Sequence, residues 1–503
     1  MPRPSPRALL GVMLLALVVR LGVAASEGLF LDEIYAWQLA ASPVDQVLAH
    51  GRVEPIPPGF YLLLGPWARW TSDPFLLRLP SLLAAVLAAG LLFRAGWRLG
   101  GPAVALGASL LLAVTWTGWI ADTQVRMYGL LVLLNVAVLA GWLALREEAP
   151  AWKRVAWWGA CLALPLVHYL GLPTLAALAL ARPRRRLVAP LLAGLAVGAG
   201  WLAFAAAGTR NAPAAAGLEP WAPWAVWTLP AWLTGLTVVP SWAFFRGADP
   251  MPGAATEWVA GLGGLGLWVL AARGVLVLAR RDREAARALA ALVLVPLGTV
   301  LAGAALGFQL FQQRYLVPSA FAFFLALVLG IPERARPALL GALVAVNLAT
   351  AALFPGDPYL WNQDWRPVAD FVRRHETGGD VLVAHIPYSL AGFNQYYATR
   401  LYRLDFSRKG EIPRFQFDPA YEGVAQVGVW KATALAGGLE DYLRGRRVFL
   451  LFNQEDPDEA RVLLEWFEAR YEVEAALAVP SLHDWGRIHA WRLRPRPVPA
   501  PAQ

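Results

Sequence analysis

Residues 8–25, ALLGVMLLALVVRLGVAA, form a nearly continuous apolar run that follows Arg3 and Arg7. A helix that crosses a membrane needs about 20 mostly apolar residues, and this run is close to that length. A secretory signal peptide is the alternative interpretation. Arg20 inside the run and the lack of a convincing cleavage site favour a retained membrane anchor.

Further apolar runs begin near residues 79, 103, 127, 155, 169, 187, 258, 286, 315 and 338. Together with the first run they predict about eleven transmembrane helices, interrupted around Pro165 and Pro173. Only 16% of the residues are charged and 58% are hydrophobic, whereas a soluble protein has roughly a quarter of its residues charged. The shortage of charge lies before residue 356, so we expect a polytopic α-helical membrane domain over residues 1–355.

From residue 356 onward the composition becomes that of a water-soluble chain. The pattern predicts an amphipathic helix over 364–375, a strand over 380–385, a strand over 447–452, a helix over 456–471 and a strand over 488–493. Alternating strands and helices indicate a small α/β domain over residues 356–495. Residues 496–503 are Pro-rich, and we expect a disordered tail.

Basic residues predict the orientation in the membrane, because Lys and Arg concentrate in short cytoplasmic loops. They fall in alternate loops, on the side of the N-terminus, which is therefore predicted to be cytoplasmic. The outer face of the cell membrane then receives segments 26–78 and 208–257, the short turns near residues 122 and 309, and the C-terminal domain. The basic residues that set this pattern are Arg3, Arg7, Arg94, Arg98, Arg146, Lys153, Arg154, Arg182, Arg184, Arg185, Arg186, Arg280, Arg281, Arg283, Arg334 and Arg336.

The same distribution argues against nucleic-acid binding, although the formal net charge is +9. A nucleic-acid site needs a basic face, and this chain gives most of its surface to lipid. Cys161 is the only cysteine, so no internal disulfide can form.

Asp32 and Glu33 follow the first apolar run, on the predicted outer side. Adjacent carboxylates at a membrane surface are costly to desolvate and therefore call for an explanation. One explanation is a solvated charge pair at a helix end. Another is a general base, or a carboxylate pair that holds a divalent cation.

The rest of this outer segment contains Glu54, the paired prolines Pro57 and Pro58, and the sequence Arg78-Leu79-Pro80-Ser81. Prolines fix the backbone and can stiffen a re-entrant segment that lies on the bilayer. Alone, these prolines only mark turns. Together with the carboxylates they indicate a rigid, structured surface on the outer side of the membrane.

Two arginines stand where predicted outer turns meet apolar runs: Arg126, in Arg126-Met127-Tyr128, and Arg314, followed by Tyr315. Their position on the outer side runs against the usual bias for positive charge. Each side chain either extends to the lipid headgroups or binds a lipid phosphate with paired N–H donors.

His168 and Asp364 have plainer readings. A single histidine at the end of an apolar run, such as His168 in His168-Tyr169, is more often structural than a ligand. Asp364, before Trp365, is a candidate helix N-cap.

Taken in order, Leu31-Asp32-Glu33, Pro57-Pro58, Arg78-Leu79-Pro80-Ser81, Arg126-Met127-Tyr128, His168-Tyr169, Arg314-Tyr315 and Asp364-Trp365 resemble the motifs of a known enzyme family. The chain resembles bacterial relatives of protein O-mannosyltransferases and the lipid A aminoarabinose transferase, which are GT-C-type enzymes that use polyprenyl-phosphate sugars (glycosyltransferase family 39-like). The resemblance covers the membrane domain well and the soluble domain loosely.

The resemblance implies a sugar donor linked to polyprenyl phosphate and transfer to an acceptor hydroxyl outside the cytoplasm, with inversion at the anomeric carbon. Asp32 would be the general base, and Glu33 would orient Asp32, the acceptor or a divalent cation. Arg126 and Arg314 would stabilise the departing lipid phosphate. The remaining residues expected to bind substrate are Glu54, Tyr128, His168 and Tyr315.

Two departures limit this transfer of roles. Many relatives carry His before the paired prolines, where this chain has Ile56, and an acidic residue near the arginine, where it has Gln124. The roles of those residues are therefore not carried over, although Asp122 is a candidate substitute for the second.

The main rival function is a lipid or sugar transporter or flippase, which would place ionisable groups near the membrane midplane and show internal repeats. A receptor or assembly scaffold is the non-catalytic rival. Neither explains carboxylates and arginines gathered on one predicted face. The sequence leaves the sugar and the acceptor (protein, lipid or polysaccharide) open.

Overall fold

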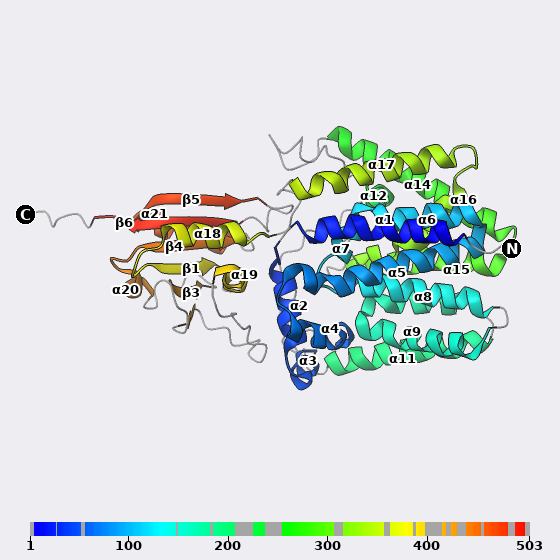
Figure 1. Cartoon of the computed structure of the whole chain (residues 1–503), viewed down its shortest axis with the longest axis horizontal. Coiled ribbons are helices and arrows are strands. Elements are labelled where there is room, and N and C mark those ends of the chain that lie inside the picture. The colour runs from blue at the N-terminus through cyan, green and yellow to red at the C-terminus, as the bar shows by residue number, and fades with distance from the viewer. Residues whose placement is uncertain are drawn as a thin grey trace, which may run out of the picture. The chain divides into compact units, whose positions relative to one another are not determined.

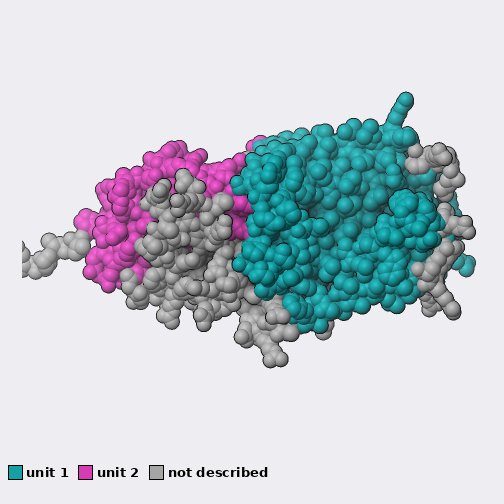
Figure 2. All heavy atoms as spheres, turned by 60° about the horizontal axis from the view of Figure 1, so that its bottom comes forward, with its two compact units in different colours: residues 1–25, 40–355 teal, residues 26–39, 356–503 magenta. Residues whose placement is uncertain are grey.

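The computed structural model describes residues 5–26, 28–51, 56–146, 149–181, 185–206, 225–236, 254–305, 315–356, 363–385, 389–397, 415–418, 424–429, 439–453, 457–480 and 488–497. Glu54, Arg314, Arg184 and the end of the predicted tail, residues 498–503, lie outside them. The chain forms two compact units: residues 1–25 with 40–355, and residues 26–39 with 356–503 (Figures 1 and 2). The segment with Asp32 and Glu33 thus belongs to the second unit, whereas the sequence assigns it to the membrane domain.

The first unit is helical throughout its described residues (Figure 1). Its elements are α1 (Pro6–Ala24), α3 (Val44–His50), α4 (Gly59–Trp70), α5 (Pro74–Gly100), α6 (Pro102–Val114), α7 (Trp116–Asp122), α8 (Tyr128–Leu145), α9 (Ala151–Val167), η1 (Tyr169–Gly171), α10 (Leu172–Leu180), α11 (Arg185–Ala206), α12 (Ala225–Leu233), α14 (Ala254–Ala279), α15 (Arg283–Ala305), η3 (Val317–Ser319), α16 (Ala320–Gly330), α17 (Arg336–Leu353) and η4 (Phe354–Gly356).

Each of the eleven apolar runs forms a helix. Within the described residues, seven helices are long and apolar enough to cross a membrane. The other four runs form the shorter helices α6, α9, α10 and α16. The prediction of a polytopic helical membrane protein is therefore confirmed.

Burial separates the central helix from the outer ones. All residues of α16 are buried, whereas α1 exposes Leu10, Leu14 and Val18 along its length. A helix that is apolar all round must face either protein or lipid. The apolar side chains exposed on α1 are suited to lipid, and α16 forms part of the interior of the bundle.

The crossing of α14 and α16 depends on glycine. A Cβ atom on Gly274 would lie 1.9 Å from Ala326 O, and one on Gly330 would lie 1.7 Å from Leu270 O. Arg273 also donates to Gly330 O. Small residues allow helix backbones to approach closely in a membrane, so any larger side chain at either glycine would force these two helices apart.

Two predicted cytoplasmic loops meet in the first unit. Arg146, at the end of α8, pairs with Asp282 at 2.6 Å and with Glu284 at 3.3 Å. Asp282 lies in the turn between α14 and α15. Its pKa is lowered chiefly by the hydrogen bond from Arg146. These two loops therefore lie at the same end of the bundle, here called the arginine-rich end.

The second unit contains α2 (Leu31–Ala41), whose last two residues belong to the first unit, and a six-stranded mixed sheet in the order β2-β3-β1-β4-β6-β5. Strand β1 runs parallel to β3 and β4, and the other pairings are antiparallel. The strands are β1 (Val381–His385), β2 (Phe415–Asp418), β3 (Ala425–Val429), β4 (Val448–Asn453), β5 (Tyr471–Val479) and β6 (Ile488–Pro495). The helices packed with them are α18 (Arg366–His375), α19 (Ser389–Tyr397), α20 (Glu440–Leu443) and α21 (Pro457–Arg470).

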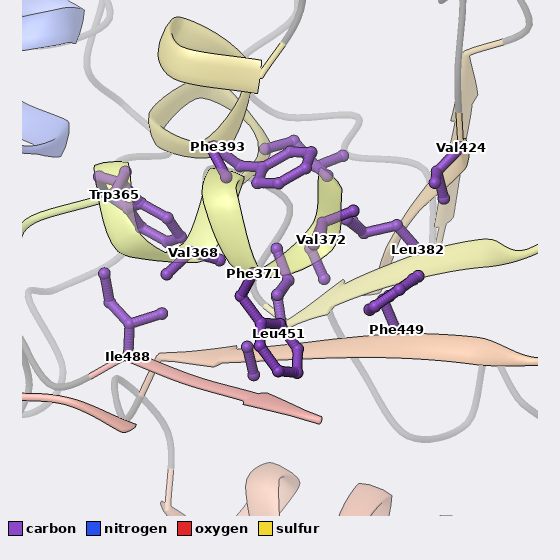
Figure 3. Packing of buried hydrophobic residues seen from close by; sticks show 14 of the residues in the cluster. Trp365, Val368, Phe371, Val372, Leu382, Phe393, Val424, Phe449, Leu451 and Ile488 are labelled. Atoms are coloured by element: carbon purple, nitrogen blue, oxygen red, sulfur yellow. The ribbon is translucent and has the colours of Figure 1, made fainter. Parts of the chain in front are cut away.

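Successive side chains of β1 belong to the two hydrophobic cores on opposite faces of this sheet. Leu382 and Ala384 join the core that contains Phe371 of α18 and Phe393 of α19 (Figure 3). Val381 and Val383 belong to a second core, with Leu443 of α20 and Leu463 of α21 among its members. Because successive side chains of a strand point to opposite faces, the sheet is covered on both sides, and the burial of all five β1 residues follows.

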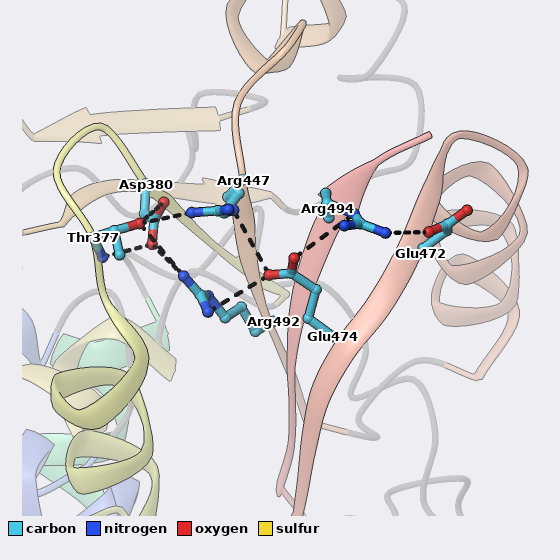
Figure 4. A network of polar contacts seen from close by, with 7 residues as sticks. All are labelled: Thr377, Asp380, Arg447, Glu472, Glu474, Arg492 and Arg494. Atoms are coloured by element: carbon cyan, nitrogen blue, oxygen red, sulfur yellow. Dashed lines mark hydrogen bonds and ion pairs between the residues drawn. The ribbon is translucent and has the colours of Figure 1, made fainter. Parts of the chain in front are cut away.

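A polar network joins the ends of four strands (Figure 4). Asp380, before β1, accepts from Thr377 N at 2.8 Å and from Thr377 Oγ1 at 2.9 Å. Arg492 of β6 lies 3.9 Å from Asp380 and 3.6 Å from Glu474 of β5. Arg447, Arg494 and Glu472 complete the network, and the pKa of Glu472 is lowered chiefly by its hydrogen bond from Arg494.

Two sequence expectations for this unit need correction. Trp365, rather than Asp364, is the N-cap of α18. Asp364 instead accepts from the backbone N–H of Arg366 at 3.1 Å. Arg496, assigned to the tail, donates its backbone N–H to Arg470 O at 2.9 Å, so the chain remains hydrogen-bonded beyond Pro495.

Candidate functional site

Residues 57–59, 78–81, 122–128 and 168 converge at one end of the first unit, here called the motif end. The contacts that join them fix its geometry. Ser81 Oγ, on α5, donates to the carbonyl of Arg126 at 2.8 Å. A Cβ atom on Gly129 would lie 2.2 Å from Ser81 O, so only glycine lets α8 start this close to α5.

The paired prolines lead into α4, whose first residue touches the end of α9. A Cβ atom on Gly59 would lie 2.6 Å from the carbonyl of Leu166. Leu166 lies two residues before His168, the C-cap of α9. The segment with Pro57 and Pro58 is thereby attached next to the histidine that the sequence singles out.

His168 has a structural task. Its Nδ1 atom accepts from the backbone N–H of Leu170 at 3.0 Å and caps the short helix η1. In the neutral ring, Nε2 therefore carries the proton. The His168 ring lies 4.1 Å from that of Tyr169 and 6.3 Å from that of Tyr128, measured between centroids. His168 therefore caps η1 and lies beside Tyr128, and its role in substrate binding remains a prediction.

Arg126 lies in a tight turn between α7 and α8. Its backbone N–H donates to Gln124 O at 2.7 Å, and its carbonyl accepts from Ser81. The side chain is half-buried. A half-buried arginine at the membrane end of a helix bundle can present several N–H donors to an anion. Tyr315 lies two residues before η3, which packs against α7 and α8, and so comes to the same part of the unit.

Two arginines that the sequence analysis gave no site role hold this end in place. Arg20 is fully buried and pairs with Asp122 at 2.7 Å. It also donates to Ala113 O at 2.7 Å and Leu112 O at 3.2 Å, at the end of α6. Arg78 is 1% exposed and donates to Ala24 O at 2.9 Å.

The Arg20 contacts change the reading of Asp122. Asp122 was a candidate substitute for the acidic residue that relatives carry near the arginine, but its carboxylate pairs with Arg20. The missed signal was the charge inside an apolar run: an ionisable residue in a membrane helix calls for a partner. Arg20 supplied that signal and Asp122 is the partner.

Asp32 and Glu33 lie in the first turn of α2, in the second unit. Glu33 is fully buried, and its Oε2 atom accepts from the backbone N–H of Phe30 at 3.3 Å. Such a bond from the third helical residue back to the N-cap stabilises the start of a helix. Asp32 is half-buried and lies where the helix dipole favours negative charge.

The structure thus groups Arg126, Tyr128 and His168, with Tyr315 on a neighbouring segment, and places the two acidic residues on the other unit. Glu54 and Arg314 fall in the parts of the chain that are not described. Among the described residues, no group of three or more His, Cys, Asp or Glu side chains could hold a metal ion. The divalent cation remains a prediction.

No protein-family model matches this chain, and no curated protein matches it significantly. Among solved structures it is similar to ArnT from Cupriavidus metallidurans in the apo state, with 16% identity, a TM-score of 0.45 and coverage of 96% of this chain and 97% of that one. It is also similar to the Archaeoglobus fulgidus oligosaccharyltransferase in the apo form, with 14% identity, a TM-score of 0.45 and coverage of 77% and 64%.

At these identities and TM-scores, the site and the activity of this chain can be inferred only from its own residues.

Proposed function

We propose that this protein is a membrane glycosyltransferase that moves a sugar from a polyprenyl-phosphate donor to an acceptor hydroxyl on the extracytoplasmic side. The observation that carries the proposal is the convergence of four sequence motifs, about 110 residues apart at their extremes, at the motif end. Arg126, Tyr128 and His168 come together there through the Ser81, Gly129 and Gly59 contacts. A catalytic site needs such convergence.

In this proposal the acceptor hydroxyl loses its proton to Asp32 while its oxygen attacks the anomeric carbon. The bond from that carbon to the lipid phosphate oxygen breaks, so the configuration inverts. Negative charge develops on the departing phosphate, and the guanidinium groups of Arg126 and Arg314 stabilise it. Glu33, buried and bonded to the Phe30 N–H, holds the start of α2 and so the backbone of Asp32.

A transporter or flippase is the second candidate. It would use ionisable groups deep in the bundle, and one fully buried pair, Arg20 with Asp122, lies in the first unit. That pair is committed to the α6 carbonyls and to each other, which suits a fixed support better than a moving ion or substrate site.

The test is sugar transfer by the purified protein in lipid vesicles from a labelled polyprenyl-phosphate sugar. We expect Asp32→Asn to reduce the turnover by about 10²–10⁴-fold, the contribution of a positioned base, without loss of folded protein. Asp45→Asn, at an exposed position in α3, is the matched control and should retain activity. Near wild-type turnover by Asp32→Asn would remove Asp32 from the mechanism.

A further inference from the structure

Side chains of the second unit form hydrogen bonds with the backbone of the segment that leads into Asp32 and Glu33. The phenol oxygen of Tyr396, on α19, accepts from the backbone N–H of Leu29 at 2.6 Å. The side-chain oxygen of Gln363 accepts from the backbone N–H of Leu31 at 3.4 Å. Both amides lie within three residues of Asp32, and their partners come from more than 330 residues further along the chain.

A third contact fixes the start of this segment. Arg366 donates from Nη2 to the carbonyl of Ser26 at 3.1 Å. Asp364 holds the same guanidinium through two bonds, from Nε at 2.8 Å and from Nη2 at 2.9 Å. Paired bonds of this kind orient an arginine more firmly than a single contact. Asp364 is buried, with 5% of its surface exposed, whereas the Arg366 side chain is 41% exposed, so only the carboxylate side of this pair is shielded from water.

Gly28 shows how closely the segment passes. A Cβ atom there would lie 2.7 Å from the Tyr396 phenol oxygen and 3.2 Å from an Asp364 carboxylate oxygen. Trp365, between the two charged residues, is fully buried in the core around α18 and α19. The core of the second unit thereby sets the positions of Asp364 and Arg366.

We infer that Asp364, Arg366 and Tyr396 are positioning residues, which hold the backbone of residues 26–31 so that the Asp32 carboxylate meets the acceptor hydroxyl. This inference rests on the proposed function for its catalytic half. It gives the Asp364-Trp365 motif a task that helix capping does not explain, and it makes the soluble domain part of the catalytic machinery.

The experiment uses the full-length protein and two matched tyrosines of α19. Tyr396→Phe removes the acceptor for the Leu29 N–H. Tyr397→Phe also removes a phenol that accepts a backbone N–H, from Val424 at 3.2 Å, but that bond does not involve residues 26–31. We expect hydrogen exchange in a peptide covering residues 28–33 to become about fivefold faster in Tyr396→Phe, as the loss of one net hydrogen bond implies, and to stay unchanged in Tyr397→Phe.

The second part of the inference, that these residues position Asp32 for catalysis, is tested in the transfer assay by measuring kcat and KM separately. Tyr396→Phe and Arg366→Gln should lower kcat about 10- to 100-fold with little change in the donor KM, because a misplaced reacting group slows the chemical step. Arg366→Lys should recover less than half of that loss, since lysine lacks the paired bonds to Asp364. Arg444→Gln, which removes an exposed arginine paired with Asp441 at the end of α20, is the matched control.

Unchanged hydrogen exchange in both Tyr396→Phe and Arg366→Gln would show that these side chains do not hold the backbone of residues 26–31. Faster exchange with unchanged kcat would refute the positioning role alone. A wild-type protein without transfer activity would overturn both the proposed function and the catalytic role of the positioning residues. The hydrogen-exchange result would still decide whether these residues hold the backbone of residues 26–31.

Discussion

The two ends of the helix bundle use arginine in opposite ways. At the arginine-rich end, Arg94 and Arg98 are exposed, and Arg146 pairs with carboxylates that water still reaches. At the motif end, Arg20 and Arg78 are almost fully buried and bind backbone carbonyls. Exposed charge in short loops sets membrane orientation at little energetic cost, whereas buried charge must be fully paired. Only the second arrangement indicates a site that the fold is built to support.

Arg20 gives the largest expected difference between the two ends. Arg20→Met leaves Asp122 buried without its cation, and breaking a buried pair in this way costs about 3–5 kcal/mol. The midpoint of unfolding in detergent should fall accordingly. Arg98→Met, an exposed arginine at the arginine-rich end, should change stability by less than about 0.5 kcal/mol.

A double variant separates the ion pair from general packing. Arg20→Met with Asp122→Leu should recover part of the lost stability, because no buried charge is left unpaired. The recovery stays incomplete, since the carbonyls of Leu112 and Ala113 lose their donors. Equal effects of Arg20→Met and Arg98→Met would remove the distinction between the ends.

The smallest effect belongs to the Arg146–Asp282 pair. The Asp282 pKa is lowered in the folded protein, so the pair contributes stability above the unfolded pKa of about 4, and this contribution is lost as the pH falls through the folded pKa. A partly exposed pair of this kind contributes about 1 kcal/mol. Asp282→Asn should therefore be slightly less stable than the wild type at pH 7, and the difference should shrink as the pH falls through the lowered pKa of Asp282. A difference that stays constant as the pH falls would show that Asp282 acts by packing instead.

The helices of the first unit could be predicted because each membrane span must satisfy its own backbone hydrogen bonds and therefore appears as a long apolar run. In the second unit, β1, β4, β6, α18 and α21 were expected within a few residues, whereas β2, β3, β5 and α19 were missed. Strands β2 and β3 have only four and five residues, so they depend on pairing with distant neighbours, as β3 does with β1. Strand β5 has nine residues but lies at the edge of the sheet, where β6 is its one neighbour.

The candidate site was predictable as a set of residue types but not as a set of contacts. The sequence identified Arg126, Tyr128 and His168, and the structure groups them. It did not reveal that Tyr396 binds the Leu29 amide, because side chain and backbone partners 367 residues apart leave no periodic pattern. Nor did it reveal that Arg20 pairs with Asp122.

Binding of a lipid phosphate by Arg126 decides whether the motif end holds the sugar donor. Binding of a polyprenyl phosphate without sugar should be measured for wild type, Arg126→Lys, Arg126→Ala and Arg98→Ala in detergent. Hydrogen bonds to a charged group contribute about 1.5–3 kcal/mol. We therefore expect affinity to fall about 10-fold in Arg126→Lys, which keeps the charge but loses the paired donors, and about 100-fold in Arg126→Ala, with Arg98→Ala unchanged. Equal affinity in Arg126→Ala and wild type would contradict the claim that the motif end holds the donor phosphate.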